Sequence, residues 1–122
     1  ITVSGEACPL WAAIVEANEA NSAGADYFVK KHIEQLMQTD PDIDTIVLGC
    51  THYPFVQEMI RKIIGPHARF FDGALGIARQ TERRLAAEYL LSDRKAPGTI
   101  IWQNSSADAR LIALGKKLLA IK

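Results

Sequence analysis

Residues 45–54 read TIVLGCTHYP and contain the clearest structural signal in the chain. Their first four residues are β-branched or aliphatic, a composition typical of a buried parallel strand. Gly49 allows the backbone to turn sharply where the strand ends, and Pro54 fits the first turn of a helix. These ten residues therefore predict a strand that leads directly into a helix.

Helical and extended patterns alternate on both sides of this junction. After Pro54, apolar residues recur at intervals of three and four until Gly65-Pro66, the usual order of residues at a helix end. Further strands are expected at 1–6, 68–71 and 99–102, a loop at 18–25, and further helices at 10–17, through 29–37, from about 74 to 91, and after a cap at 104–106. Such alternation predicts an α/β fold with a mainly parallel sheet.

The composition excludes several classes of protein. Fourteen basic and fourteen acidic residues cancel, which argues against an extended nucleic-acid surface. No run of about twenty apolar residues is present, so no membrane span is expected. The two cysteines, Cys8 and Cys50, occur in different settings, which favours a reducing compartment over a disulfide framework. The chain opens as if within a strand, without Met and without a signal-peptide pattern, which suggests a fragment.

Ligands of parallel α/β sheets bind where strands end, and the sequence offers three such junctions, at 49–54, 72–76 and 103–106. The first joins a thiol, a hydroxyl and an imidazole in Cys50, Thr51 and His52. A nearby helix N-terminus favours a thiolate, and a histidine exchanges protons near neutral pH. Equally, Cys50 could be a small buried apolar residue and His52 a helix cap. Spacing alone leaves both interpretations open.

Residues 48–54 match the signature around the second catalytic cysteine of glutamate racemases. The core at 49–51 resembles the wider aspartate/glutamate racemase superfamily, and the continuation at 52–54 points to the glutamate branch. Flanking segments resemble the same family at residues 7–10, 15–16, 71–72 and 76–79. The resemblance covers about residues 1–90 and implies a three-layer αβα fold with a mainly parallel sheet.

The resemblance also implies a reaction and a set of roles. The family interconverts L- and D-glutamate without a cofactor, using two cysteines that act as acid and base on opposite faces of the α-carbon. By this resemblance Cys50 is one of the two catalytic cysteines, His52 assists its proton transfer, and Glu16 orients or polarises His52. Thr51 binds the substrate carboxylate, with Cys50 and His52 also contacting substrate. The product would supply peptidoglycan synthesis in a bacterial cytoplasm.

The chain also departs from the family pattern. The family's first cysteine lies in an N-terminal Cys-Asn-Thr segment, which is absent here, and the context of Cys8 does not match it. We therefore expect the C-terminal portion of a two-domain racemase, with about 1–72 bearing the second catalytic cysteine. About 73–122 would form a helix–strand–helix segment that could pack on the N-terminal domain. Such a chain is expected to be inactive alone, and a homodimer is left open.

The remaining chemical side chains are interpreted as structural. Cys8, Trp11 and Trp102 are expected to pack, His32 to lie on a solvated helix face and His67 in a turn. Arginines 79, 83 and 84 form a solvated helix face. No metal site is expected, because Cys50 and His52 supply only two ligands. The alternatives are another racemase of the superfamily (aspartate or hydantoin), a related lyase, or a non-catalytic α/β binding domain.

Overall fold

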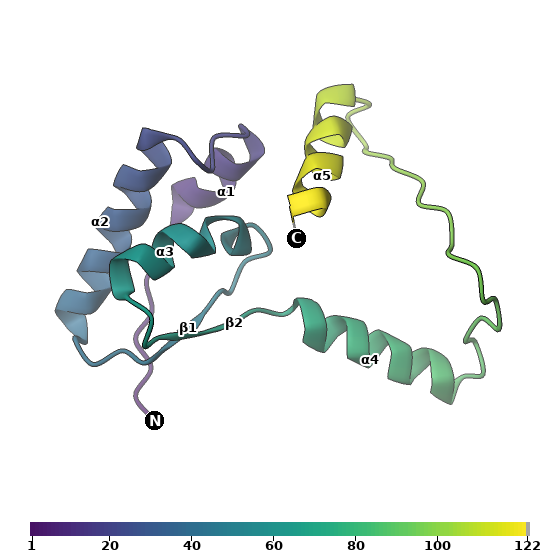
Figure 1. Cartoon of the computed structure of the whole chain (residues 1–122), viewed down its shortest axis with the longest axis horizontal. Coiled ribbons are helices and arrows are strands. Elements are labelled where there is room, and N and C mark those ends of the chain that lie inside the picture. Colours follow the sequence, from purple (N-terminus) through teal and green to yellow (C-terminus); the bar gives the residue numbers. More distant parts are fainter. Residues whose placement is uncertain (122) are drawn as a thin grey trace. The chain divides into compact units, whose positions relative to one another are not determined.

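The structure is a computed structural model that describes residues 1–121 and divides into two compact units (Figure 1). The first unit is Ile1–Asp72 and the second begins at Gly73. The first contains helices α1 (Pro9–Glu16) and α2 (Ala23–Thr39), strand β1 (Thr45–Val47), the 3₁₀ helix η1 (Tyr53–Val56), helix α3 (Gln57–Ile64) and strand β2 (Arg69–Phe71). The second contains helices α4 (Ala74–Ala87) and α5 (Ala109–Ile121).

Strands β1 and β2 pair in parallel, with Ile46 opposite Phe70, and η1 and α3 form the crossover between them. The ladder continues past β1 because the Leu48 amide donates to the Phe71 carbonyl at 2.8 Å. Ile46 and Leu48 point into the core, while the alternate residue Val47 is 73% exposed and its neighbour Phe71 is 54% exposed. The parallel pairing agrees with the predicted α/β class, and one face of the sheet is open to solvent.

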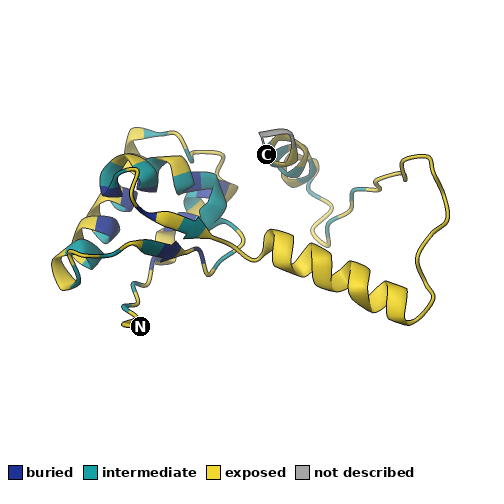
Figure 2. Ribbon diagram, turned by 60° about the horizontal axis from the view of Figure 1, so that its bottom comes forward, coloured by how far each residue is buried: buried dark blue, intermediate teal, exposed yellow. Residues whose placement is uncertain are grey.

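The core of the first unit lies where α2 packs against α3, and Figure 2 shows its buried residues gathered there. Each helix contributes a row of apolar side chains four residues apart, which is the spacing of one helix face. The two rows are Ala25, Val29 and Ile33 from α2, and Val56, Ile60 and Ile64 from η1 and α3. Trp11 and Val15 extend the core along α1.

Local signals fix the ends of these helices. The Ser22 hydroxyl accepts a hydrogen bond from the Ala25 amide at 3.1 Å and caps α2, so the helix begins inside the predicted 18–25 loop. Helix α3 ends at Ile64, and the next residue, Gly65, has a φ of 93°, a backbone conformation suited to glycine. Helix α4 ends at Ala87, before the predicted Leu91, and Tyr89 then adopts a φ of 55°.

Two predicted strands and one predicted cap are wrong. Residues 1–6 and 99–102 are not strands in the structure, because neither joins the β1–β2 ladder and an extended segment becomes a strand only by pairing. The cap predicted at 104–106 is instead supplied by Asp108, whose Oδ1 accepts from the Arg110 amide at 2.8 Å. Asn104 contributes to the preceding turn by accepting from the Asp108 amide at 3.1 Å.

In the second unit, α4 is exposed along its whole length, as Figure 2 shows. Its arginines 79, 83 and 84 are solvated, as predicted. Trp102 packs against α5 at Gly115, where an added Cβ would lie 3.0 Å from the indole Cζ3. Over residues 1–121, no helix is both long and apolar enough to cross a membrane.

Candidate active site

The candidate site is the turn that follows β1. The Tyr53 amide donates to the Cys50 carbonyl at 3.2 Å, and the Phe55 amide donates to the His52 carbonyl at 3.1 Å, so the chain coils into η1. Pro54 lies in the first turn of η1, as predicted, and η1 continues into α3 at Gln57.

Two side-chain atoms from neighbouring residues lie near one ring nitrogen of His52. The half-buried Cys50 places its Sγ 3.6 Å from His52 Nδ1, and Thr51 places its Oγ1 3.5 Å from the same nitrogen. Thr51 is exposed, which leaves its hydroxyl accessible from solvent. The turn therefore presents a thiol, a hydroxyl and an imidazole to one region.

Glu16 reaches the same imidazole from α1. Its Oε1 lies 3.0 Å from His52 Nε2. Because a carboxylate only accepts hydrogen bonds, Nε2 is the donor, and Nδ1 of a neutral ring is left as the acceptor that faces Cys50. The side chains of His52 and Glu16 are 31% and 61% exposed, so solvent weakens their attraction. All four residues predicted for the site lie together, in the order Glu16, His52, then Cys50 and Thr51.

A second group of contacts joins the turn to α1, and the sequence analysis did not single it out. The Tyr53 hydroxyl donates to the Cys8 carbonyl at 3.2 Å. Its ring packs edge-on against Trp11, with the ring centroids 5.0 Å apart. The position of Tyr53 inside the motif could have drawn attention to it. Its acceptor could not be predicted, because a backbone carbonyl is present at every residue.

Cys8 is buried at the start of α1, in agreement with its predicted packing role. Its Sγ lies 3.7 Å from the Glu6 carbonyl oxygen. Burial first, and the charge of Glu6 second, raise the pKa of the Cys8 thiol to about 11. Both Cys8 and Cys50 are free thiols, and Cys8 stays protonated at neutral pH.

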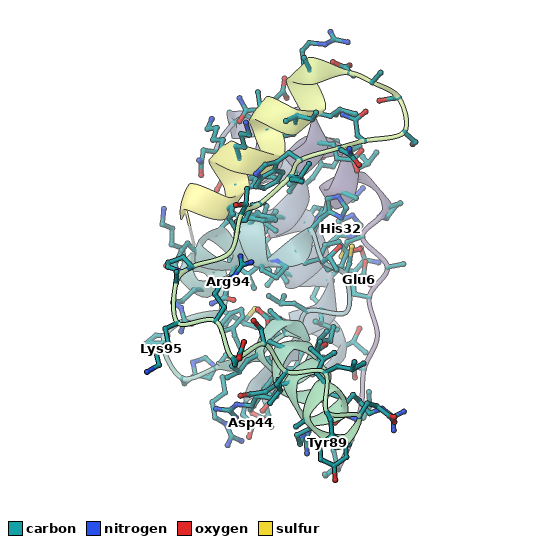
Figure 3. The ribbon with its side chains drawn as sticks, turned by 90° about the vertical axis from the view of Figure 1, so that its right-hand side faces the viewer. Glu6, His32, Asp44, Tyr89, Arg94 and Lys95 are labelled. Atoms are coloured by element: carbon teal, nitrogen blue, oxygen red, sulfur yellow. The ribbon has the colours of Figure 1, made fainter. Side chains whose placement is uncertain are left out.

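The prediction for His32 is wrong. Its side chain is only 15% exposed, and its Nδ1 lies 2.7 Å from Glu6 Oε1, a pair labelled in Figure 3. The ring also stands edge-on to Trp11 at 6.1 Å. His67 lies exposed in a turn, as predicted. Within the described part of the chain, no group of three His, Cys, Asp or Glu side chains could hold a metal ion.

Comparison with known proteins gives a consistent result. The chain is 36% identical over 115 residues to the glutamate racemase of Clostridium perfringens. The aligned segment covers 94% of this chain and 44% of that protein. Its fold matches a glutamate racemase of Bacillus anthracis with a TM-score of 0.75 at 26% identity, over 98% of this chain and 44% of the other. It also matches the Francisella tularensis glutamate racemase in complex with D-glutamate, with a TM-score of 0.68 at 27% identity, over 80% and 35% of the two chains.

These matches confirm the expected racemase-like α/β fold. The chain belongs to the glutamate racemase family. It spans less than half the length of the curated relative above, a share that agrees with the C-terminal portion of such an enzyme. No protein-family model matches the chain.

Proposed function

We propose that the chain contributes one half of the active site of a glutamate racemase, with Cys50 as one of the two proton-transferring groups. The observation that carries the proposal is the series Glu16–His52–Cys50, joined at 3.0 and 3.6 Å in a chain similar to glutamate racemases. A half-buried thiol beside an imidazole, itself bonded to a carboxylate, is a recognised acid–base arrangement.

In the proposed reaction, His52 Nδ1 accepts the thiol proton of Cys50, and Glu16 stabilises the resulting imidazolium through Nε2. The thiolate then takes the α-proton of one enantiomer and becomes a thiol again. A second thiol, outside these 122 residues, gives a proton to the opposite face of the carbon. In the reverse direction, the Cys50 thiol is the donor. No cofactor enters the proposed scheme.

Substrate binding is assigned to the same turn. The exposed Thr51 offers its hydroxyl to the α-carboxylate, which brings the α-carbon toward Cys50 and His52. Glutamate is the proposed substrate because a structural relative is described in complex with D-glutamate. The proposed biological role is the supply of D-glutamate for peptidoglycan in a bacterial cytoplasm.

The rest of the site is proposed to come from the remainder of a two-domain racemase. Residues 1–72 form the part that bears Cys50, and residues from 73 on pack on the N-terminal domain. The open face of the β1–β2 sheet, with Val47 and Phe71 exposed, supports this proposal, because parallel sheets are normally covered on both faces.

The test is a chimera in which residues 1–122 replace the matching portion of the Clostridium perfringens racemase. We expect the chimera to convert L- to D-glutamate and to exchange the α-proton with deuterated solvent. Cys50→Ala should lower the inversion rate by at least about 100-fold, because a positioned acid–base group contributes that much or more. The 122-residue chain alone should show no inversion.

Cys8→Ala in the same chimera is the matched control, since Cys8 is a buried, protonated thiol. It should retain inversion at a rate close to that of the parent. L-Aspartate offered in place of L-glutamate tests the other branch of the superfamily. Inversion that survives Cys50→Ala, or inversion by the isolated chain, would overturn the half-site proposal.

A further inference from the structure

Two consecutive side chains of the motif hold the two ends of α1. His52 contacts Glu16, the last residue of the helix, and Tyr53 bonds to the carbonyl of Cys8, the residue that precedes it. The eight residues of α1 span about 12 Å at 1.5 Å per residue. The helix is thus fixed to the turn at both ends by neighbouring residues of one motif.

The contacts of Tyr53 hold its side chain against the start of α1. Its ring packs on Trp11, which is 2% exposed and also meets His32 edge-on. Burial raises the pKa of Tyr53 above its usual value, so the phenol keeps the proton that it donates to the Cys8 carbonyl. Trp11 joins this cluster through its rings alone, because its buried indole N–H has no hydrogen-bond partner in the structure.

Helix α1 needs such support. Its N-terminus has no side-chain cap, its first turn has no acidic residue and its last turn has no basic residue. An eight-residue helix is marginal by itself and depends on packing for its position. Because Glu16 is attached to the end of this helix and is largely exposed, its approach to His52 depends on where α1 lies.

We propose that Tyr53 is a positioning residue that anchors α1 on the Cys50–His52 turn, so that Glu16 reaches His52. It acts through α1, by way of the Cys8 carbonyl and the Trp11 ring. The positioning of α1 by Tyr53 does not require that the chain be a racemase. Only the catalytic role of Glu16, His52 and Cys50 rests on the proposed function.

The test is a double-mutant cycle between Tyr53→Phe and Glu16→Gln in the 122-residue chain. The readout is the rate at which iodoacetamide alkylates Cys50 at neutral pH, followed by peptide mass spectrometry. Glu16→Gln should slow alkylation by about twofold to fivefold, the effect expected of a solvent-exposed pair. Tyr53→Phe should slow it by a similar factor, and the double variant should be no slower than Glu16→Gln alone.

Independent effects would instead multiply, and the double variant would then be about fourfold to 25-fold slower than the parent. That result, or an unchanged rate in Tyr53→Phe, would overturn the proposal. Tyr27→Phe is the matched control, because Tyr27 is an exposed tyrosine on α2, and it should leave the Cys50 rate unchanged. A simple packing role for Tyr53 would lower stability without coupling to Glu16.

Trp11→Phe provides a second route if Tyr53→Phe does not fold. It alters the ring that supports Tyr53, and it too should slow alkylation without adding to Glu16→Gln. The alkylation readout does not require turnover. Coupling in the isolated chain with an inactive chimera would therefore refute the racemase proposal alone, whereas an active chimera with uncoupled variants would refute the role of Tyr53 alone.

Discussion

The buried thiol of Cys8 should make the folded chain lose stability in alkaline solution. The pKa of this thiol is raised from 9.0 to about 11 by burial and by Glu6. Between these values the unfolded chain has released the proton and the folded chain still holds it. The unfolded state then binds fewer protons, so the free energy of unfolding falls as the pH rises.

The size of the effect follows from the same two values. The two pKa values differ by about 2, and each pKa unit corresponds to about 1.36 kcal/mol, so the free energy of unfolding should fall by about 2.7 kcal/mol. The contribution is fully present below pH 9.0 and is lost as the pH passes about 11. A domain of this size has a free energy of unfolding of about 5–15 kcal/mol, so the loss is large enough to measure.

The assay is urea unfolding of the parent chain and Cys8→Ala at a series of pH values from about 8 to 12. Alanine cannot titrate, so the stability of the parent should fall toward that of the variant as the pH rises. Burial, and secondarily the neighbouring Cys8 and Cys50, also raise the pKa of Tyr53, so the same pair of proteins is compared in a Tyr53→Phe background to remove that contribution. Curves that stay parallel across this range would refute the reasoning.

Two further predictions concern stability and use the same unfolding measurement. Ile60→Ala should lower the free energy of unfolding by about 2–5 kcal/mol, because Ile60 is fully buried between α2 and α3. The control Ile77→Ala, at an exposed position, should change it by less than about 0.5 kcal/mol. Equal losses in the two variants would contradict the assigned core. Gly65→Ala should lower the free energy of unfolding by about 1–3 kcal/mol, because its φ of 93° disfavours a side chain and an added Cβ would lie 3.2 Å from the His67 ring. Gly76→Ala should raise it by about 0.5–1 kcal/mol, because Gly76 lies within α4 and an added Cβ there meets open space. Effects of the same sign in the two variants would contradict this explanation.

The elements that the sequence predicted well are those with a strong periodic or turn signal. The apolar row that ends at Gly65 marks α3, and the run at 45–48 marks β1. The segment 68–71 was predicted as a strand and becomes β2. In each case the local pattern and the tertiary contacts favour the same conformation, so the pattern is sufficient.

The features that the sequence missed depend on partners far away in the chain. Residues 1–6 have strand-like composition but join no ladder, and a sequence pattern does not report pairing. His32 lies on a helix rich in charges, yet its side chain is only 15% exposed and pairs with Glu6, 26 residues earlier. The carboxylate–imidazole contact of Glu16 was inferred only through the family resemblance, since no spacing rule links residues 36 positions apart.

Because the two thiols differ in burial, their relative rates of chemical modification report local opening of the chain. Cys50 is half-buried and can meet a small reagent in the native state, whereas Cys8 lies 7% exposed at the start of α1. Modification of Cys8 therefore requires a transient opening, and its rate relative to Cys50 measures the opening equilibrium. Local release of α1 and global unfolding would differ in their response to urea. One labelling time course would thus show how often the helix that bears Glu16 detaches from its turn.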